Sequence, residues 1–144
     1  MPGEVRPVVA DAMLRHPKIC DATTTLGRAR ELLRDDHVHA LLVVDDHGLL
    51  RAVVEREDLA EGAADTLAEH AGRLADRTVG PHVDLVDTQR RMRRNRRRRL
   101  AVVDGRGRLL GLLCLKRSGT GFCSDDGVRA RAAESRRGAT PSAR

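Results

Sequence analysis

Eight arginines stand within ten residues of this chain, in the run RRMRRNRRRR at positions 90–99. The guanidinium group is planar and can donate paired hydrogen bonds to phosphate oxygens, so the run predicts contact with anionic groups. The formal net charge is +6, and the chain without these eight arginines would sum to −2. The basic character is therefore mostly local, unlike that of a uniformly basic nucleic-acid-binding domain.

The sequence lacks the common patterns of catalytic and metal sites. The three cysteines, Cys20, Cys114 and Cys123, have no CxxC spacing, and His37 and His39 stand two residues apart rather than at a helical ligand spacing. No nucleophile stands beside a positioned base, and no phosphate loop of the Walker kind occurs. We therefore expect buried structural thiols and a protein without catalytic activity, metal or required cofactor.

The arginine run lies in one half of an internal repeat. The stretch LLVVDDHGLLRAVV at 41–54 returns as LAVVDGRGRLLGLL at 100–113, offset by 59 residues without a gap. Each copy is predicted to form a strand, a turn rich in Asp and Gly, and a second strand. An apolar stripe at helical spacing precedes both pairs, namely Leu26, Ala29, Leu32 and Leu33 in the first copy and Leu85, Thr88 and Met92 in the second. One small α/β unit is thus used twice.

We divide the chain into three parts. Residues 1–65 form the first repeat, 66–118 the second repeat with a shortened entry, and 119–144 a glycine loop, a helix from about Gly127 to Ser135 and a disordered basic tail. Helices are also expected from Glu57 onward and over 66–74. No apolar run approaches about 18 residues and no signal-like block begins the chain, so we expect a cytoplasmic protein.

The order of short motifs around the first copy resembles the CBS domain, the family named after cystathionine beta-synthase, as a tandem pair. The entry VxDAM (9–13) is followed by His16-Pro17, the VVD strand end and the closing segment AVVEREDL (52–59). The family closes with Gly, two apolar residues, Thr or Ser, two variable residues and Asp. The resemblance implies an α/β fold of two strand-helix-strand-strand-helix repeats, packed about a pseudo-twofold axis with two clefts that often bind adenosyl ligands.

Carried over residue by residue, the resemblance implies a ligand site in the first repeat. Asp58 matches the acid that accepts hydrogen bonds from ribose hydroxyls, although a helix N-cap is an alternative role. Glu55 replaces the Thr or Ser that donates to phosphate, and it would repel a phosphate charge by about 3 kcal/mol at about 5 Å and a dielectric near 20. The site would then prefer a neutral or cationic adenosyl group, or need nearby arginines. Further implied ligand contacts are Val53, Thr23, Leu41, Arg98 and Arg99.

The second repeat departs from the family pattern at the same positions. Gly111 is retained, but Cys114 replaces the Thr and Arg117 replaces the Asp, so a hydrogen-bond acceptor has become a donor. We expect the second adenosyl site to be lost. Lys116 and Arg117, with the amides of Gly119 to Gly121, form a candidate anion site, and a plain flexible loop is the alternative.

Three functions follow from these observations. The first is a stand-alone regulatory module, expected as a homodimer, that senses AMP, ADP, ATP or S-adenosylmethionine and signals to an unknown partner. The second is a polyanion or nucleic-acid binder using Arg90 to Arg99, where a solvated helix face or a dimer contact is the competing role. The third is a protein-interaction module that needs no ligand.

Overall fold

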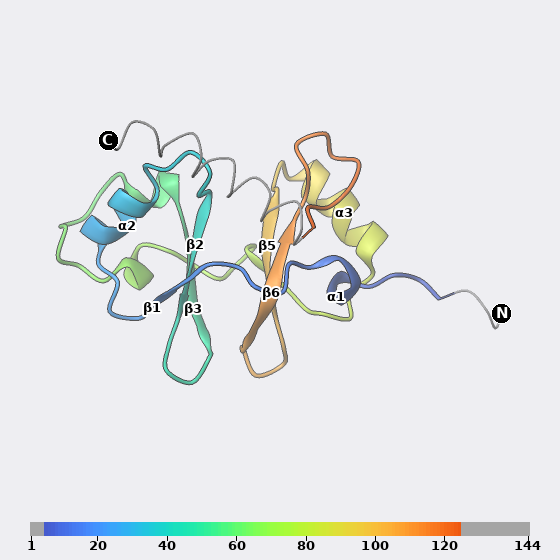
Figure 1. The fold of residues 1–144 in the computed structure, drawn as a ribbon, viewed down its shortest axis with the longest axis horizontal. Coiled ribbons are helices and arrows are strands. Elements are labelled where there is room, and N and C mark those ends of the chain that lie inside the picture. Colours follow the sequence, from blue (N-terminus) through green and yellow to red (C-terminus); the bar gives the residue numbers. More distant parts are fainter. Residues whose placement is uncertain (1–4, 125–144) are drawn as a thin grey trace, which may run out of the picture.

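The computed structural model describes residues 5–124, which form two similar α/β units side by side (Figure 1). Each unit contains a three-stranded sheet with one main helix beside it, α2 in the first unit and α3 in the second. The elements in chain order are α1 (Val9–Ala12), β1 (Ile19–Asp21), α2 (Leu26–Leu32), β2 (Ala40–Val44), β3 (Leu50–Glu55), the 3-10 turns η1 (Arg56–Leu59) and η2 (Ala68–His70), β4 (Thr78–Val79), α3 (Leu85–Arg94), β5 (Arg99–Val103) and β6 (Leu109–Cys114).

The two sheets have the same topology and the same register. The first has the order β1-β2-β3 and the second β4-β5-β6, each with a parallel pair followed by an antiparallel hairpin. A shift in register falls between Val43 and Val44 in one hairpin and between Val102 and Val103 in the other. The 59-residue offset seen in the sequence therefore extends to an irregularity that no sequence motif marks.

The hairpin tips are closed by equivalent aspartates. Asp45 Oδ1 accepts hydrogen bonds from the amides of His47 and Leu49, and Asp104 Oδ1 does the same at Arg106 and Arg108. In both turns the following glycine has a left-handed backbone, with φ of 82° and 87°, which glycine adopts without a Cβ clash. The two tips also bind each other, because the Leu50 amide donates to Gly107 and the Leu109 amide to Gly48.

Each repeat's entry segment packs against the other repeat. Leu14 pairs with Leu112 of β6, and Arg73, 59 residues later, pairs with Val53 of β3. Likewise, the Val9 amide donates to the Val83 carbonyl, and the Ala68 amide donates to Thr24. Since each contact recurs with the repeats exchanged, the predicted pseudo-twofold arrangement is confirmed.

Aliphatic side chains build the core, as the near absence of aromatic residues predicts. One cluster fills each unit, around Val43 and Val54 in the first and around Val102 and Leu113 in the second. A third cluster joins the two sheets across their common interface; its buried members are Leu42, Val44, Leu50, Val53 and Ala101. Because both repeats contribute to this cluster, apolar burial stabilises their association.

Helix α2 begins where the sequence predicts, with Thr25 as N-cap accepting the Arg28 amide, and α3 buries the predicted Thr88 and Met92. The expected helix over 66–74 was wrong in extent, because only the turn η2 forms there. The segment from Glu57 is likewise the short 3-10 turn η1. The expected helix at Gly127–Ser135 lies outside the described residues. Among residues 5–124, no helix is long and apolar enough to span a membrane.

Candidate functional site

A basic pocket of about 270 Å³ lies where the two repeats meet, at the strand ends opposite the hairpin tips; we call it the inter-repeat pocket. Five arginines and two glutamates line it together with one histidine, so positive charge is in excess. The lining residues are His39, Glu55, Arg56, Glu57, Arg96, Arg97, Arg98 and Arg99. The structure thus brings together three residues predicted from the sequence: Glu55, Arg98 and Arg99.

The carboxylate of Glu55 is already paired with arginines. Its Oε2 accepts a hydrogen bond from Arg97 Nη1 at 2.7 Å, and its Oε1 lies 3.4 Å from Arg77 Nη2. Just before Arg97, the chain turns at Arg96, whose backbone is left-handed with φ of 56°, after the end of helix α3. The pairing offsets the repulsion that Glu55 alone would exert on a phosphate.

Asp58 is held by Arg77, a residue that the sequence analysis did not single out. Arg77 Nη1 donates to Asp58 Oδ2 at 2.6 Å and Nη2 donates to Oδ1 at 3.1 Å, while Nη1 also donates to the Val53 carbonyl at 2.7 Å. The Arg77 side chain is only 1% exposed. Asp58 in addition accepts the Glu55 amide at 2.8 Å. It therefore stands in the third position of η1, and Glu55, not Asp58, is the N-cap.

Opposing effects set the ionisation of Asp58. Burial alone would raise its pKa, but hydrogen bonds from Arg77 and from the Glu55 amide outweigh burial, so the pKa lies below its ordinary value. The Asp58 hydrogen bond in turn raises the pKa of Arg77. Both groups are charged at neutral pH and form a partly buried ion pair that joins the two repeats. The Arg77 Nε is buried without a hydrogen-bond partner among the described residues.

His39 is uncharged in the inter-repeat pocket. Burial is the main cause that lowers its pKa to about 4, followed by the positive charges of Arg99, Arg56 and Arg98 in that order. A neutral imidazole can accept or donate one hydrogen bond without adding to the positive charge. The pocket therefore owes its net charge to arginine alone.

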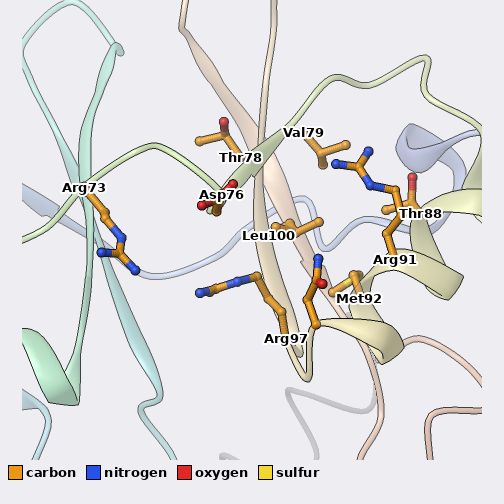
Figure 2. A pocket seen from close by; sticks show the side chains of 10 residues that line it. Arg73, Asp76, Thr78, Val79, Thr88, Arg91, Met92, Arg97 and Leu100 are labelled. Atoms are coloured by element: carbon orange, nitrogen blue, oxygen red, sulfur yellow. The ribbon is translucent and has the colours of Figure 1, made fainter.

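A second pocket, of about 390 Å³, lies beside helix α3 and shares Arg97 with the first; we call it the α3 pocket. Figure 2 shows Arg73 and Arg97 extending toward each other from opposite sides, with Asp76 and Thr78 above Leu100. The remaining lining side chains are Val79, Thr88, Arg91, Met92 and Asn95. The volume is within the usual range for a small-molecule site, but the lining is more polar than usual, because only Val79, Met92 and Leu100 are apolar.

The first repeat has aliphatic residues where the α3 pocket has polar ones. Leu32 and Val38 pack on the first core cluster. The residues 59 positions later are Arg91 and Arg97, whose long side chains extend to the pocket rim instead. The same fold thus carries a filled core in one repeat and a pocket in the other.

Other predicted ligand contacts lie apart from both pockets. Thr23 is exposed and donates through its amide to Asp21 in the loop before α2. Leu41 is buried in the first core cluster, and Val53 contributes its carbonyl to Arg77. Neither Thr23 nor Leu41 lines a pocket in the described part of the chain, so the structure does not bring them to the predicted site.

The candidate anion site after β6 is a closed turn. The Lys116 amide donates to the Gly121 carbonyl and the Gly119 amide donates to the Lys116 carbonyl, each at 2.8 Å. The Gly119 carbonyl accepts from Gln89 of α3 at 2.8 Å. The Gly119 amide is thus already used within the turn, and the Thr120 amide donates to Ser118 Oγ at 3.4 Å, so neither amide is free to bind an anion.

Arg77, Arg73 and Arg56 are the site residues that sequence reasoning missed. Arg77 precedes a short apolar strand, and the equivalent position in the first repeat is Lys18. A basic residue beside a strand start in both copies was the available signal. No group of histidines, cysteines and carboxylates within residues 5–124 could hold a metal ion.

Two α/β repeats of one topology, related by a pseudo-twofold axis and enclosing a basic pocket, define a tandem-repeat module. A family model described as the CBS domain matches residues 9–65 and 76–117, so the chain belongs to the CBS domain family. The predicted family and fold are thereby confirmed. CBS pairs are generally regulatory and not catalytic.

Known relatives are similar over most of this chain. Inosine-5'-monophosphate dehydrogenase of Mycobacterium tuberculosis is 31% identical over 106 residues, which are 72% of this chain but only 20% of that enzyme. The acetoin utilization protein AcuB from Vibrio cholerae has a TM-score of 0.65 at 22% identity, covering 91% of this chain and 93% of its own.

Two further solved structures of this fold contain adenosyl compounds. CBSX2 in complex with AMP has a TM-score of 0.63 at 24% identity, covering 90% of this chain and 98% of that one. The CBS pair of protein MJ0100, in complex with 5'-methylthioadenosine and S-adenosyl-L-methionine, has a TM-score of 0.61 at 16% identity, covering 91% and 99%.

Proposed function

We propose that this protein is a non-catalytic regulatory module that senses a phosphate-bearing adenosyl ligand (AMP, ADP or ATP) and signals its bound state to a partner. The observation that carries the proposal is the inter-repeat pocket, in which five arginines surround a Glu55 already paired with Arg97. Charge-assisted hydrogen bonds from guanidinium groups suit phosphate oxygens. The AMP bound to CBSX2 supports the ligand class, whereas the compounds bound to MJ0100 support only its adenosyl part.

The two pockets divide the proposed ligand between them. Phosphates occupy the inter-repeat pocket beside Arg98 and Arg99, and the nucleoside extends past Arg97 into the α3 pocket, over Met92 and Leu100. Asp58 lines neither pocket, and its carboxylate already accepts three hydrogen bonds, so its contact with a ribose hydroxyl remains a prediction from the family resemblance. The excess of positive charge favours nucleotides over the cationic S-adenosylmethionine.

Isothermal titration of the full chain with ATP, ADP, AMP, adenosine and S-adenosylmethionine tests this proposal. Nucleotides should bind more tightly than the two compounds without phosphate. Arg99→Met should weaken nucleotide binding by roughly 10- to 100-fold, the usual effect of losing a charge-assisted hydrogen bond. Arg106→Met, at the exposed hairpin tip, is the matched control and should leave affinity unchanged. No binding of any compound at millimolar concentration would remove the sensing function.

Homodimerisation, a cytoplasmic location and the identity of the regulated partner remain predictions. A dimer is expected because CBS pairs commonly associate, and sedimentation equilibrium of the full chain measures it directly. A ligand-independent interaction module is the alternative if titration detects no adenosyl compound.

A polyanion-binding function is favoured by a separate observation. Arg90, Arg93 and Arg94 on α3 and Arg96 after it are exposed. Within the described part of the chain, the one acidic group in salt-bridge range of these four is Asp87, 3.7 Å from Arg90. With Phe122 as the sole aromatic residue, stacking on bases is nearly excluded, so binding would be through phosphates and weakly selective.

A further inference from the structure

Two of the three cysteines lie side by side at the end of the second repeat. The Sγ atoms of Cys114 and Cys123 are 2.8 Å apart, and both residues are buried, with exposed fractions of 6% and 7%. A disulfide requires about 2.05 Å between sulfurs, so closure needs a shift of under about 1 Å. Cys20 belongs to the first repeat, beside the first core cluster.

The backbone holds the two thiols opposite each other. The Cys123 amide donates to the Cys114 carbonyl at 2.7 Å, and the Lys116 amide donates to Gly121 at 2.8 Å. Between these bonds Leu115 and Phe122 form an antiparallel bridge, and Phe122 packs on the core of the second repeat. The backbone therefore already holds residues 114 and 123 together, in the arrangement that a bond between the sulfurs requires.

We propose that Cys114 and Cys123 are a reversible oxidation site, at which an intramolecular disulfide forms by exchange with a small-molecule disulfide such as glutathione disulfide. One thiolate attacks the small disulfide and releases one small thiol. The second thiolate then attacks the mixed disulfide and releases the other. The protein loses two protons and two electrons, and the small disulfide gains them as two thiols.

Closure of this bond would fix the turn 116–121 to β6. That turn also contacts helix α3, since the Gly119 carbonyl accepts a hydrogen bond from the Gln89 side chain. Cys114 stands opposite Arg99 in the β5–β6 pairing, and Arg99 lines the inter-repeat pocket. Cys114 is therefore the strand partner of a residue that lines the inter-repeat pocket. Oxidation of the two cysteines would restrain both this pocket and the turn 116–121.

Exchange at this site should be slow at neutral pH. Burial, and then the Cys123 hydrogen bond, raise the pKa of Cys114 to about 11, so its thiolate is scarce. The small disulfide can reach the buried thiols only when the turn opens locally. The rate of disulfide formation should therefore increase as the pH is raised from 7 to 9.

The experiment uses the full chain, reduced and then incubated with glutathione disulfide. N-ethylmaleimide added in denaturant traps the remaining thiols, and peptides are mapped by mass spectrometry without reduction. We expect two of the three thiols to be lost, a Cys114–Cys123 cross-linked peptide, and Cys20 alkylated. The proposal would be overturned if all three thiols were alkylated after prolonged incubation. It would also be overturned if glutathione were found on single cysteines without a cross-link.

Variants separate this pair from the third cysteine. Cys20→Ser should form the cross-link as the wild type does, whereas Cys114→Ser should leave Cys123 as a thiol or a mixed disulfide. Hydrogen exchange gives a second measurement on the wild type, which needs no variant to fold. The amides of Lys116 and Gly119 should exchange more slowly in the oxidised chain, and unchanged exchange there would contradict the predicted restraint.

Discussion

Arg77 and Asp58 form a two-pronged ion pair across the boundary between the repeats. The two contacts measure 2.6 and 3.1 Å, and the side chains are 1% and 11% exposed. Asp58 lies in η1, after the last strand of the first repeat, and Arg77 precedes β4 of the second. In this structure, the acid that the CBS resemblance assigns to ribose holds the entry segment of the second repeat.

Removing Arg77 should destabilise the protein. Arg77→Leu leaves the Asp58 charge partly buried and without its main partner, which typically costs about 3–5 kcal/mol of unfolding free energy. Urea denaturation followed by circular dichroism measures it. Arg28→Leu, which breaks the exposed pair with Glu31, is the control and should produce no measurable change. A similar small effect from both variants would show that the Arg77 pair contributes little.

Acid should remove the contribution of this pair. Because the folded-state pKa of Asp58 is below its ordinary value, the unfolded chain binds its proton first, and stability falls as the pH decreases through this range. The contribution is complete above the unfolded pKa of about 4, and it is lost progressively as the pH falls from there through the lower folded pKa. The difference in unfolding free energy between wild type and Arg77→Leu should therefore narrow from pH 7 to pH 3. A constant difference would contradict this assignment.

His39 should titrate far below an ordinary histidine. Its folded pKa of about 4 is below the unfolded value near 6.5, so the unfolded chain binds the proton first and stability decreases as the pH falls from 6.5 to 4. Proton NMR, assigned with His39→Gln, measures the pKa directly, and the variant should reduce the pH dependence of stability. Nucleotide bound nearby should raise the pKa, since negative charge favours imidazolium. Titration near 6.5 in the free protein would contradict the burial.

The entry segment of the first repeat passes close to Gly111 of β6. A Cβ added there would lie 2.5 Å from the Leu14 carbonyl oxygen and 2.8 Å from Met13 Sδ. Gly111→Ala should therefore destabilise the protein by about 1–3 kcal/mol, measured by chemical denaturation. Gly105→Ala is the matched control, since a Cβ there meets nothing within 4 Å. Equal unfolding free energies of the two variants would show that the entry segment can shift away from residue 111 without cost.

The exposed arginines can be tested through salt dependence. If about five of them engage phosphates, the logarithm of the binding constant for duplex DNA should fall against the logarithm of salt concentration with a slope near −4.5. Replacing Arg90, Arg93 and Arg94 with glutamine should reduce that slope, as measured by fluorescence anisotropy. Nucleotide binding should change little, because these arginines line neither pocket. A slope near zero in the wild type would exclude the polyanion function.

Much of the fold could be predicted because its signals are local. Asp45 and Asp104 close their own turns, Thr25 caps its own helix, and Thr88 and Met92 follow the helical period. The short helices were predicted less well. The segment 66–74 has helix-forming residues, but its contacts with the first repeat leave only one turn of 3-10 helix. Tertiary pairing therefore outweighed local propensity there.

The candidate site was predicted in part. Glu55, Arg98 and Arg99 meet in the inter-repeat pocket, because each stands at a strand end and the strands align at one edge. Thr23 and Leu41 were assigned through the resemblance alone, and their places in the α2 loop and the core keep them apart from both pockets.

The turns follow from the order of residues alone, since each depends on neighbours within a few positions. The repeat and its 59-residue register follow from comparing the two stretches of sequence directly. The partner of Asp58 followed only from the folded arrangement. Arg77 is 19 residues away in another repeat, and the two meet because the entry segment crosses to β3, where Arg73 pairs with Val53. Contacts of that kind depend on how two sheets pack, which no local pattern encodes.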